Sequence, residues 1–220
     1  MDQPLIPTRK NPRTHRLVKL ARRYPATFRL SRADRGFLRD LARVQLLSRD
    51  LIDRHHYAHL KHGAESPLAR LERAGILRSQ ILRVTHRPEQ RLYSFANQDL
   101  ARVWGGKLPV LGARRTSWHE MMVSRLYYEL GCPEDFRVAA NFSKEDLFAC
   151  GSVRPDALYT DPESGELVAV EADSGHYSAK QINQKINRWR NLGLTHQVWG
   201  QPKQSNARMA SLPGITCMQL

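Results

Sequence analysis

Two carboxylates in the second half of the chain have the types and spacing to act on a phosphodiester. Asp156 opens one apolar run, in the sequence Arg154-Pro-Asp156, and Glu171 ends the run that begins at Leu167. The intervening turn, Pro162-Glu-Ser-Gly165, predicts a hairpin that brings both carboxylates to one end of two adjacent strands. Because two carboxylates can hold a divalent metal ion over a phosphate, the pattern indicates a metal-dependent site or the remnant of one.

The surplus of positive charge lies in the first half of the chain. The net charge is +14, and residues 1–115 carry 25 Lys and Arg against 9 Asp and Glu, whereas residues 116–220 carry 10 against 12. Such a basic half predicts binding to a polyanion. We favour double-stranded DNA over an acidic membrane surface or an acidic protein.

Cysteine spacing and hydropathy restrict the class of protein further. Cys132, Cys150 and Cys217 show no paired spacing, which argues against a zinc ribbon or a disulfide framework. No stretch reaches the roughly 18 apolar residues of a membrane span, and no apolar leader is recognisable. We therefore expect a cytoplasmic protein with no membrane partner.

Residues 1–30 combine many basic side chains with four prolines. Prolines oppose regular structure and like charges resist collapse, so this segment is expected to be a flexible basic arm. Lys10, Arg13 and Arg16 would then lie along DNA phosphates. A tail that only increases solubility is the alternative.

Residues 31–96 predict three helices followed by a hairpin. The helices are expected to begin at Ser31, Ser48 and Ser66, each a residue able to cap a helix, and the third should end at Gly75. The periodicity then changes from helical to alternating, which predicts strands near residues 81–84 and 91–95 joined by a loop over 85–90.

This order resembles a winged helix-turn-helix, in which the third helix enters the major groove and the hairpin loop lies on the neighbouring backbone. A winged helix can instead dock another protein, and that alternative stays open. The expected DNA contacts of this part are all arginines: Arg49, Arg70, Arg73, Arg78, Arg83, Arg87 and Arg91.

Four histidines on the second expected helix and just beyond it, His55, His56, His59 and His62, also have same-face spacing. Because no acidic or cysteine partners cluster with them, a solvated or phosphate-facing stripe is favoured over a zinc site.

Residues 97–115 read as a connector, and 116–220 as a second domain of mixed helices and strands. A helix is expected to open at Ser117 and to end at Gly131. The later elements are expected as strands near 136–140, 153–159 and 167–172, a helix over 178–191, and strands near 197–199 and 215–218.

The resulting αβββαβ order resembles the core of the PD-(D/E)xK nuclease-like fold. That resemblance places Glu120 on the first helix and implies that Asp156 and Glu171 bind Mg or Mn if the domain is nuclease-active. Asp173 stands where such nucleases carry a lysine, and Lys185, or less favourably Lys180, is the candidate replacement from the next helix. The alternative is that both carboxylates are structural and pair with Arg154, Arg188 or Arg190.

The motifs also resemble the replication-relaxation family of plasmid and integrative-element proteins over roughly residues 31–192. They are Trp118-His-Glu120, Arg154-Pro-Asp-Ala157, Val170-Glu-Ala-Asp-Ser-Gly175 and Lys185-Ile-Asn-Arg-Trp189. The resemblance implies a DNA-binding accessory protein at an origin of transfer or replication, with a relaxase or a replication protein as partner. Its Glu-x-Asp pattern makes Asp173 a family trait, which favours a domain that does not cut.

The sequence thus predicts a two-domain protein of the α+β or α/β class, a winged helix-turn-helix followed by a nuclease-like domain. A DNA-binding accessory protein, which requires no cofactor, is the favoured function. A metal-dependent DNA endonuclease and a winged-helix transcription regulator are the alternatives. Because winged helices often read two half-sites, a homodimer is compatible with each of them.

Overall fold

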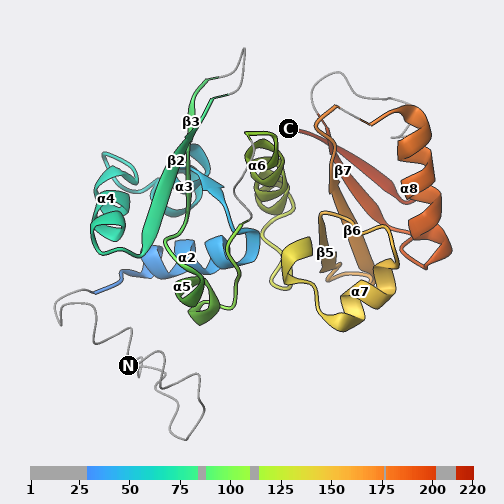
Figure 1. Ribbon diagram of the computed structural model, residues 1–220, viewed down its shortest axis with the longest axis horizontal. Coiled ribbons are helices and arrows are strands. Elements are labelled where there is room, and N and C mark those ends of the chain that lie inside the picture. The colour runs from blue at the N-terminus through green and yellow to red at the C-terminus, as the bar shows by residue number, and fades with distance from the viewer. Residues whose placement is uncertain (1–28, 84–87, 110–113, 176, 202–211) are drawn as a thin grey trace, which may run out of the picture.

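The protein is a mixed α and β molecule with two sheets (Figure 1). The computed structural model describes residues 29–83, 88–109, 114–175, 177–201 and 212–220, and the side chains of 114–116 are not among them. Residues 1–28 of the expected basic arm and the tip of the expected wing therefore lie outside the described residues. Over the part that is described, no helix has the length and apolar character required to cross a membrane.

The first part of the chain forms a three-stranded antiparallel sheet with helices packed against it. The sheet order is β1-β3-β2, so the first short strand pairs with the second strand of the hairpin. The sequence patterns did not predict β1. In chain order the elements are α2 (Arg32–Val44), β1 (Leu47–Ser48), α3 (Arg49–His56), α4 (Glu65–Arg73), β2 (Leu77–Leu82) and β3 (Gln90–Phe95).

The capping serines predicted from the sequence mark the observed helix starts only in part. Ser31 caps α2 as predicted, through a reciprocal capping box with Asp34. The prediction that Ser66 caps the third helix is wrong, because α4 begins at Glu65 and its N-cap is Ala64. The backbone N–H of Ala64 donates to the carboxylate of Asp53, which satisfies the start of α4 from a neighbouring helix.

The hairpin is longer than expected and is covered on both faces. Strand β2 begins at Leu77, which pairs with Phe95, and not near Ile81. One face of the hairpin joins the core of the helices through Leu77 and Phe95, whereas Leu92 on the other face packs against Met121. Each face of the sheet therefore packs against other parts of the protein over part of its length.

The predicted connector contains regular structure. Residues Gln98–Val103 form helix α5, whose N-cap Asn97 accepts a hydrogen bond from the N–H of Leu100. The following helix, α6, runs over Arg114–Glu129 and thus begins three residues before Ser117, the expected start.

Helix α6 lies between the two sheets (Figure 1). Leu126 packs closely against Gly200 of the second sheet, where a Cβ atom would come within 2.8 Å of the leucine methyl groups. On the other side, the hydroxyl of Ser124 donates to the carbonyl of Leu46, just before β1. One hydrophobic cluster runs from Phe37 on α2 through Leu126 to Val170 in the second sheet. The two halves of the chain share this core, and their division into separate domains remains a prediction.

The second sheet has five strands in the order β4-β5-β6-β7-β8. The first three strands are antiparallel, and β6, β7 and β8 run parallel to one another. The hairpin predicted around residues 162–165 is confirmed by the pairing of β5 with β6. The strands are β4 (Arg137–Val138), β5 (Ala157–Thr160), β6 (Leu167–Ala172), β7 (Gln197–Gln201) and β8 (Ile215–Gln219).

Two features beside β4 differ from the sequence expectations. The strand expected over 136–140 is reduced to Arg137–Val138 and continues as the 3-10 turn Ala139–Asn141. Helix α7 (Lys144–Cys150) follows and was not predicted, although Ser143 and Asp146 form a capping box at its start.

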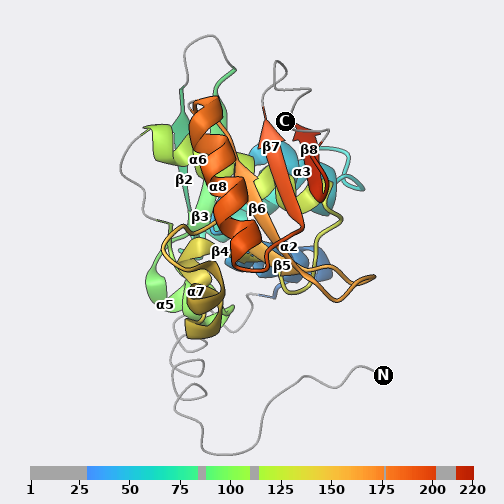
Figure 2. The same ribbon diagram turned by 90° about the vertical axis from the view of Figure 1, so that its right-hand side faces the viewer.

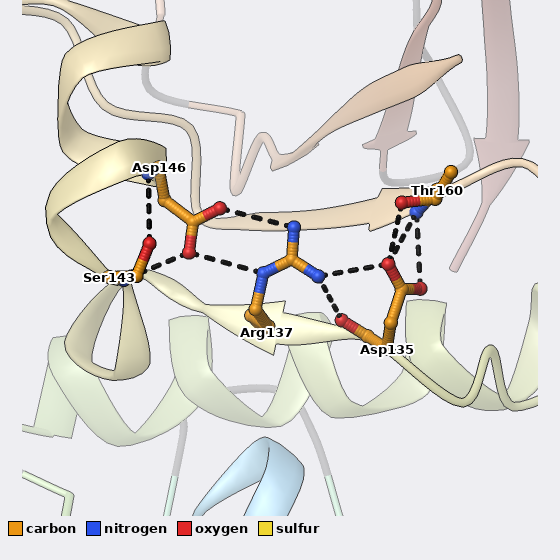
Figure 3. A network of polar contacts seen from close by, with 5 residues as sticks. All are labelled: Asp135, Arg137, Ser143, Asp146 and Thr160. Carbon is orange, nitrogen blue, oxygen red and sulfur yellow. Dashed lines mark hydrogen bonds and ion pairs between the residues drawn. The ribbon is translucent and has the colours of Figure 1, made fainter. Parts of the chain in front are cut away.

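A polar network centred on Arg137 fixes this corner (Figure 3). The guanidinium of Arg137 binds the carboxylate of Asp146 on α7 at 3.1 Å and that of Asp135 at 2.9 Å. Asp135 in turn accepts hydrogen bonds from the backbone and hydroxyl of Thr160, at the end of β5. Arg137 thereby joins β4 to α7 and, through Asp135, to the end of β5.

Helix α8 (Ala179–Asn191) covers the face of the second sheet opposite α6 (Figures 1 and 2). Its predicted bounds are confirmed to within one residue, and Ser178 caps it. Ile182, Ile186 and Trp189 are buried against the sheet, and the indole N–H of Trp189 donates to the carbonyl of Val153 at 2.6 Å.

Candidate functional site

The structure places the two candidate carboxylates at the same end of the β5–β6 hairpin. Asp156 immediately precedes β5, and because Ala157 pairs with Val170, Asp156 lies opposite Glu171. One carboxylate oxygen of Asp156 accepts the backbone N–H of Ala172 at 2.8 Å. The two residues are therefore neighbours across the hairpin, as the turn sequence predicted.

Glu171 is buried and paired. Its side chain is 0% exposed, and Oε1 accepts hydrogen bonds from the Lys185 ammonium and, at 2.8 Å, from the Tyr177 hydroxyl. Oε2 has no hydrogen-bond partner among the described residues. Burial, reinforced by the negative charge of Asp156, raises the pKa of Glu171, and Lys185 opposes that increase.

Asp156 is paired with a histidine from α6. The imidazole Nε2 of His119 lies 3.0 Å from a carboxylate oxygen of Asp156. Burial by itself would lower the pKa of His119, but the hydrogen bond and charge of Asp156 outweigh it and raise that pKa to about 9. The imidazole is therefore cationic at neutral pH and neutralises Asp156.

Glu120, the third predicted catalytic residue, is half-buried on α6 beside this pair. Burial raises the pKa of Glu120, with a smaller contribution from the charge of Asp156, while His119 lowers it. The cluster thus holds three carboxylates and two cations close to one end of the hairpin.

The two carboxylates are held from opposite faces of the sheet. Val170 packs in the cluster that contains α6, whereas Ala169 packs with α8. Asp156 is bound from the α6 side by His119, and Glu171 from the α8 side by Lys185. The arginines that the structural alternative named as partners, Arg154, Arg188 or Arg190, do not bind these carboxylates, whereas the structural role itself stays a prediction.

The described residues do not present a ready cluster of ligands for a divalent metal ion. Mg²⁺ and Mn²⁺ require several oxygen ligands around one point. Here Oε1 of Glu171 and Oδ2 of Asp156 already accept hydrogen bonds, and Oε2 of Glu171 is a buried oxygen with no hydrogen-bond partner among the described residues. Within the described ranges no three His, Cys, Asp or Glu side chains are grouped as ligands.

Asp173, which stands where the nuclease pattern has a lysine, supports the turn before α8. Its carboxylate accepts the N–H of Gly175 at 2.8 Å, and its own N–H donates to the carbonyl of Gly200 at 2.8 Å. Asp173 therefore stabilises the backbone of this turn and does not pair with Glu171. Lys180, the second candidate replacement, is exposed on α8, so Lys185 is the lysine that reaches the carboxylates.

Several predicted DNA-contacting arginines are engaged within the protein. Arg70 forms an ion pair with Asp34, which is 0% exposed, and Arg49 pairs with Asp53 at 2.7 Å. Arg70, which was expected to contact DNA, is therefore held by a carboxylate of α2 within the protein.

The other predicted contacts are more accessible. Arg73 and Arg91 are exposed, Arg78 is exposed and donates to the hydroxyl of Ser94 at 3.0 Å, and Arg83 pairs with Glu89 at the base of the hairpin loop. The remaining predicted contacts, Lys10, Arg13, Arg16 and Arg87, lie outside the described residues.

Sequence reasoning missed a row of arginines on α2. Arg32, Arg35 and Arg39 are exposed at helical spacing on the side opposite the buried apolar residues, and none of the three pairs with a described carboxylate. Their spacing relative to Phe37 and Leu41 is the signal that could have identified them.

The histidines of α3 contact α6. His55 stacks on Tyr128 with ring centroids 4.0 Å apart, and Nε2 of His56 lies 2.8 Å from the Tyr128 hydroxyl and 3.3 Å from Asp40. The expectation of a solvated stripe is wrong for His56, which is half-buried in this contact.

Comparison with known proteins identifies the chain at the level of family. The model of the replication-relaxation family matches residues 38–206, which is most of the sequence. The chain belongs to the replication-relaxation family. This result confirms the resemblance drawn from the motifs and associates the protein with the replication or mobilisation of mobile genetic elements. Searches of curated proteins and of solved structures gave no match.

Proposed function

We propose that this replication-relaxation protein is a DNA-binding accessory factor that acts at an origin of replication or transfer. The observation that carries the proposal is the order of the first six elements, helix, strand, helix, helix, strand, strand, with β1 completing the sheet of the hairpin. That order is typical of a winged helix-turn-helix, and the surplus of arginines in the same half supplies the charge that DNA binding requires.

In this proposal α4 enters the major groove. Ser66, Ala69 and Arg73 are exposed on one side of α4 at spacings of three and four residues. Two small side chains permit close approach to base edges, and an arginine can donate two hydrogen bonds to guanine or bind a phosphate. Arg70 holds α4 against Asp34 of α2 and thereby orients it.

Phosphate contacts would come from the hairpin and from α2. Arg91 lies exposed on β3, and the first helix of a helix-turn-helix crosses the DNA backbone, where the α2 arginines would lie. The basic arm and Arg87 extend the expected contacts beyond the described residues. A relaxase or a replication-initiation protein is the partner class that such a role requires, and pairing of two copies on two half-sites is part of the proposal.

We further propose that the second half supports the DNA-binding part and does not cleave DNA. The cations that neutralise Asp156 and Glu171 are protein side chains, His119 and Lys185. Incubation with supercoiled plasmid and Mg²⁺ or Mn²⁺ should therefore leave the plasmid intact. Nicking that disappears in an Asp156→Ala variant would overturn this part of the proposal without affecting the DNA-binding part.

Salt dependence tests the DNA-binding role. The logarithm of the binding constant should fall linearly with the logarithm of salt concentration, with a slope of about 0.9 for each neutralised phosphate. Arg73→Ala combined with Arg91→Ala should reduce the slope by about 2 when both residues contact phosphate, or by about 1 together with relaxed base preference when Arg73 reads a base.

A matched control removes the same charge elsewhere. Arg102→Ala combined with Lys144→Ala also removes two exposed cations, one paired with Asp99 on α5 and one on α7. This control should retain the wild-type slope. Equal slopes for the two double variants would show that α4 and the hairpin do not form the interface.

A further inference from the structure

The exposed side of α8 carries an unusual set of side chains. Six residues recur at spacings of three and four and form one stripe along the helix, which we call the α8 stripe. They are Lys180, Asn183, Gln184, Asn187, Arg188 and Asn191. All six are exposed, and none makes a hydrogen bond or ion pair with another described residue. Helix α8 contains no Asp or Glu.

Solvent exposure by itself does not account for this composition. An exposed helix face in a soluble protein typically mixes acidic and basic residues, which support one another at four-residue spacing. The stripe instead places Asn183, Asn187 and Asn191 in a row, although asparagine is a weak helix former. Because these side chains make no hydrogen bond or ion pair within the described part of the chain, their polar groups are available to a ligand.

The opposite side of α8 is fixed to the protein. Ile182, Ile186 and Trp189 are buried against the sheet, and Lys185 binds Glu171 at the inner edge. Arg190 donates to the carbonyl of Pro213. The stripe is therefore presented on a rigid helix, so little backbone conformational entropy is lost when a ligand binds.

We propose that the α8 stripe is a second DNA-binding surface, separate from α4 and the hairpin, and that it takes a second duplex segment. This inference rests on the proposed DNA-binding function. Amide side chains donate to phosphate oxygens and to the edge of adenine, and two cations that form no ion pair with a described carboxylate attract the DNA backbone. Eleven residues of rise make the stripe about 17 Å long, which suits one crossing of a major groove about 12 Å wide.

The location of α8 implies that the stripe binds a different DNA segment from the one bound by α4. Helices α4 and α8 lie at opposite ends of the long axis of the molecule, with α6 and the second sheet between them (Figure 1). The stripe faces away from the sheet, because the buried residues of α8 face it. A straight duplex on α4 therefore does not reach the stripe, and one protein molecule would hold two DNA segments together.

A bridging assay with the full chain tests this inference. One duplex is fixed to beads, protein is added in buffer containing EDTA, and capture of a second, fluorescent duplex is measured. Retention of protein on the beads reports the proposed function, whereas captured fluorescence reports the second surface. Protein that fails to bind the beads contradicts the proposed function, and protein that binds without capturing the second duplex contradicts only the bridging inference.

The decisive variant is Asn183→Ala combined with Asn187→Ala and Asn191→Ala. It leaves the net charge unchanged and replaces weak helix formers by the strongest, so loss of function cannot be assigned to unfolding. At about fivefold for each lost hydrogen bond, capture should fall by about a hundredfold while protein remains on the bead-bound duplex. Circular dichroism should show an unchanged or higher melting temperature.

The charged members of the stripe provide a second comparison. Lys180→Ala combined with Arg188→Ala should also abolish capture, whereas Arg102→Ala combined with Lys144→Ala, with the same loss of charge, should preserve it. Wild-type capture by the asparagine variant would overturn the inference and would indicate that bridging arises from pairing of two copies.

Discussion

Replacing Lys185 by methionine should destabilise the protein strongly, because the change leaves the Glu171 carboxylate buried without its counter-ion. Glu171 is 0% exposed and Lys185 is 19% exposed, so the pair is shielded from solvent. Removing one member of such a pair costs about 3–5 kcal/mol. The hydrogen bond from Tyr177 remains, which places the expected loss near the lower limit, at about 3 kcal/mol.

Removing both charges should restore most of that stability. In the double variant Glu171→Gln with Lys185→Met, no buried charge remains and the amide oxygen can still accept from Tyr177. Replacement of a buried ion pair by neutral side chains is often nearly neutral, so the double variant should lie within about 1 kcal/mol of the wild type. Urea unfolding monitored by tryptophan fluorescence measures both differences.

The stability lost in the Lys185→Met variant should depend on pH in a direction set by the pKa of Glu171. Without Lys185, the pKa of Glu171 in the folded protein lies further above its unfolded value, so the folded state binds the additional proton. The deficit of the single variant should therefore shrink as pH falls and grow as pH rises, by up to about 1.4 kcal/mol per pH unit. A loss below about 1 kcal/mol at pH 8, or a double variant as unstable as the single one, would refute the buried ion pair.

Two further predictions concern the other buried charges. Arg70→Ala should lower the free energy of unfolding by about 2 kcal/mol because it removes a charged hydrogen bond from buried Asp34, whereas the exposed neighbour variant Arg73→Ala should change it by less than about 0.5 kcal/mol in the same urea titration. Because the pKa of His119 is raised from 6.5 to about 9, its pairing with Asp156 stabilises the protein fully below pH 6.5 and loses this effect as pH rises through 9. Its contribution is at most about 3 kcal/mol, and His119→Gln should flatten the stability profile over that range; an identical profile in the variant would show that the imidazole is neutral in the folded protein.

Local signals in the sequence anticipated much of the fold. Capping serines at positions 31 and 178 and the turn over 162–165 correspond to α2, α8 and the β5–β6 hairpin. These features depend on residues close together in the chain, so their signals survive without knowledge of packing.

Elements that depend on distant partners were missed or misplaced. Strand β1 has two residues and exists because β3 pairs with it, and α4 starts at Glu65 because Asp53 binds the N–H of Ala64. The short helices α5 and α7 carried cap signals at Asn97 and Ser143, but their few residues give too little periodicity for recognition.

By itself the sequence determined the segregation of charge, the order of the main elements, the family motifs and the closeness of Asp156 to Glu171. The tertiary structure decided which cations serve those carboxylates, because His119 and Lys185 reach them from helices on opposite faces of the sheet. It also decided that Arg70 pairs with the buried carboxylate of Asp34 and that the α8 stripe makes no ion pair with the described residues. A side chain's partner depends on the packing of segments far apart in the chain, and residue spacing along one segment carries no record of that packing.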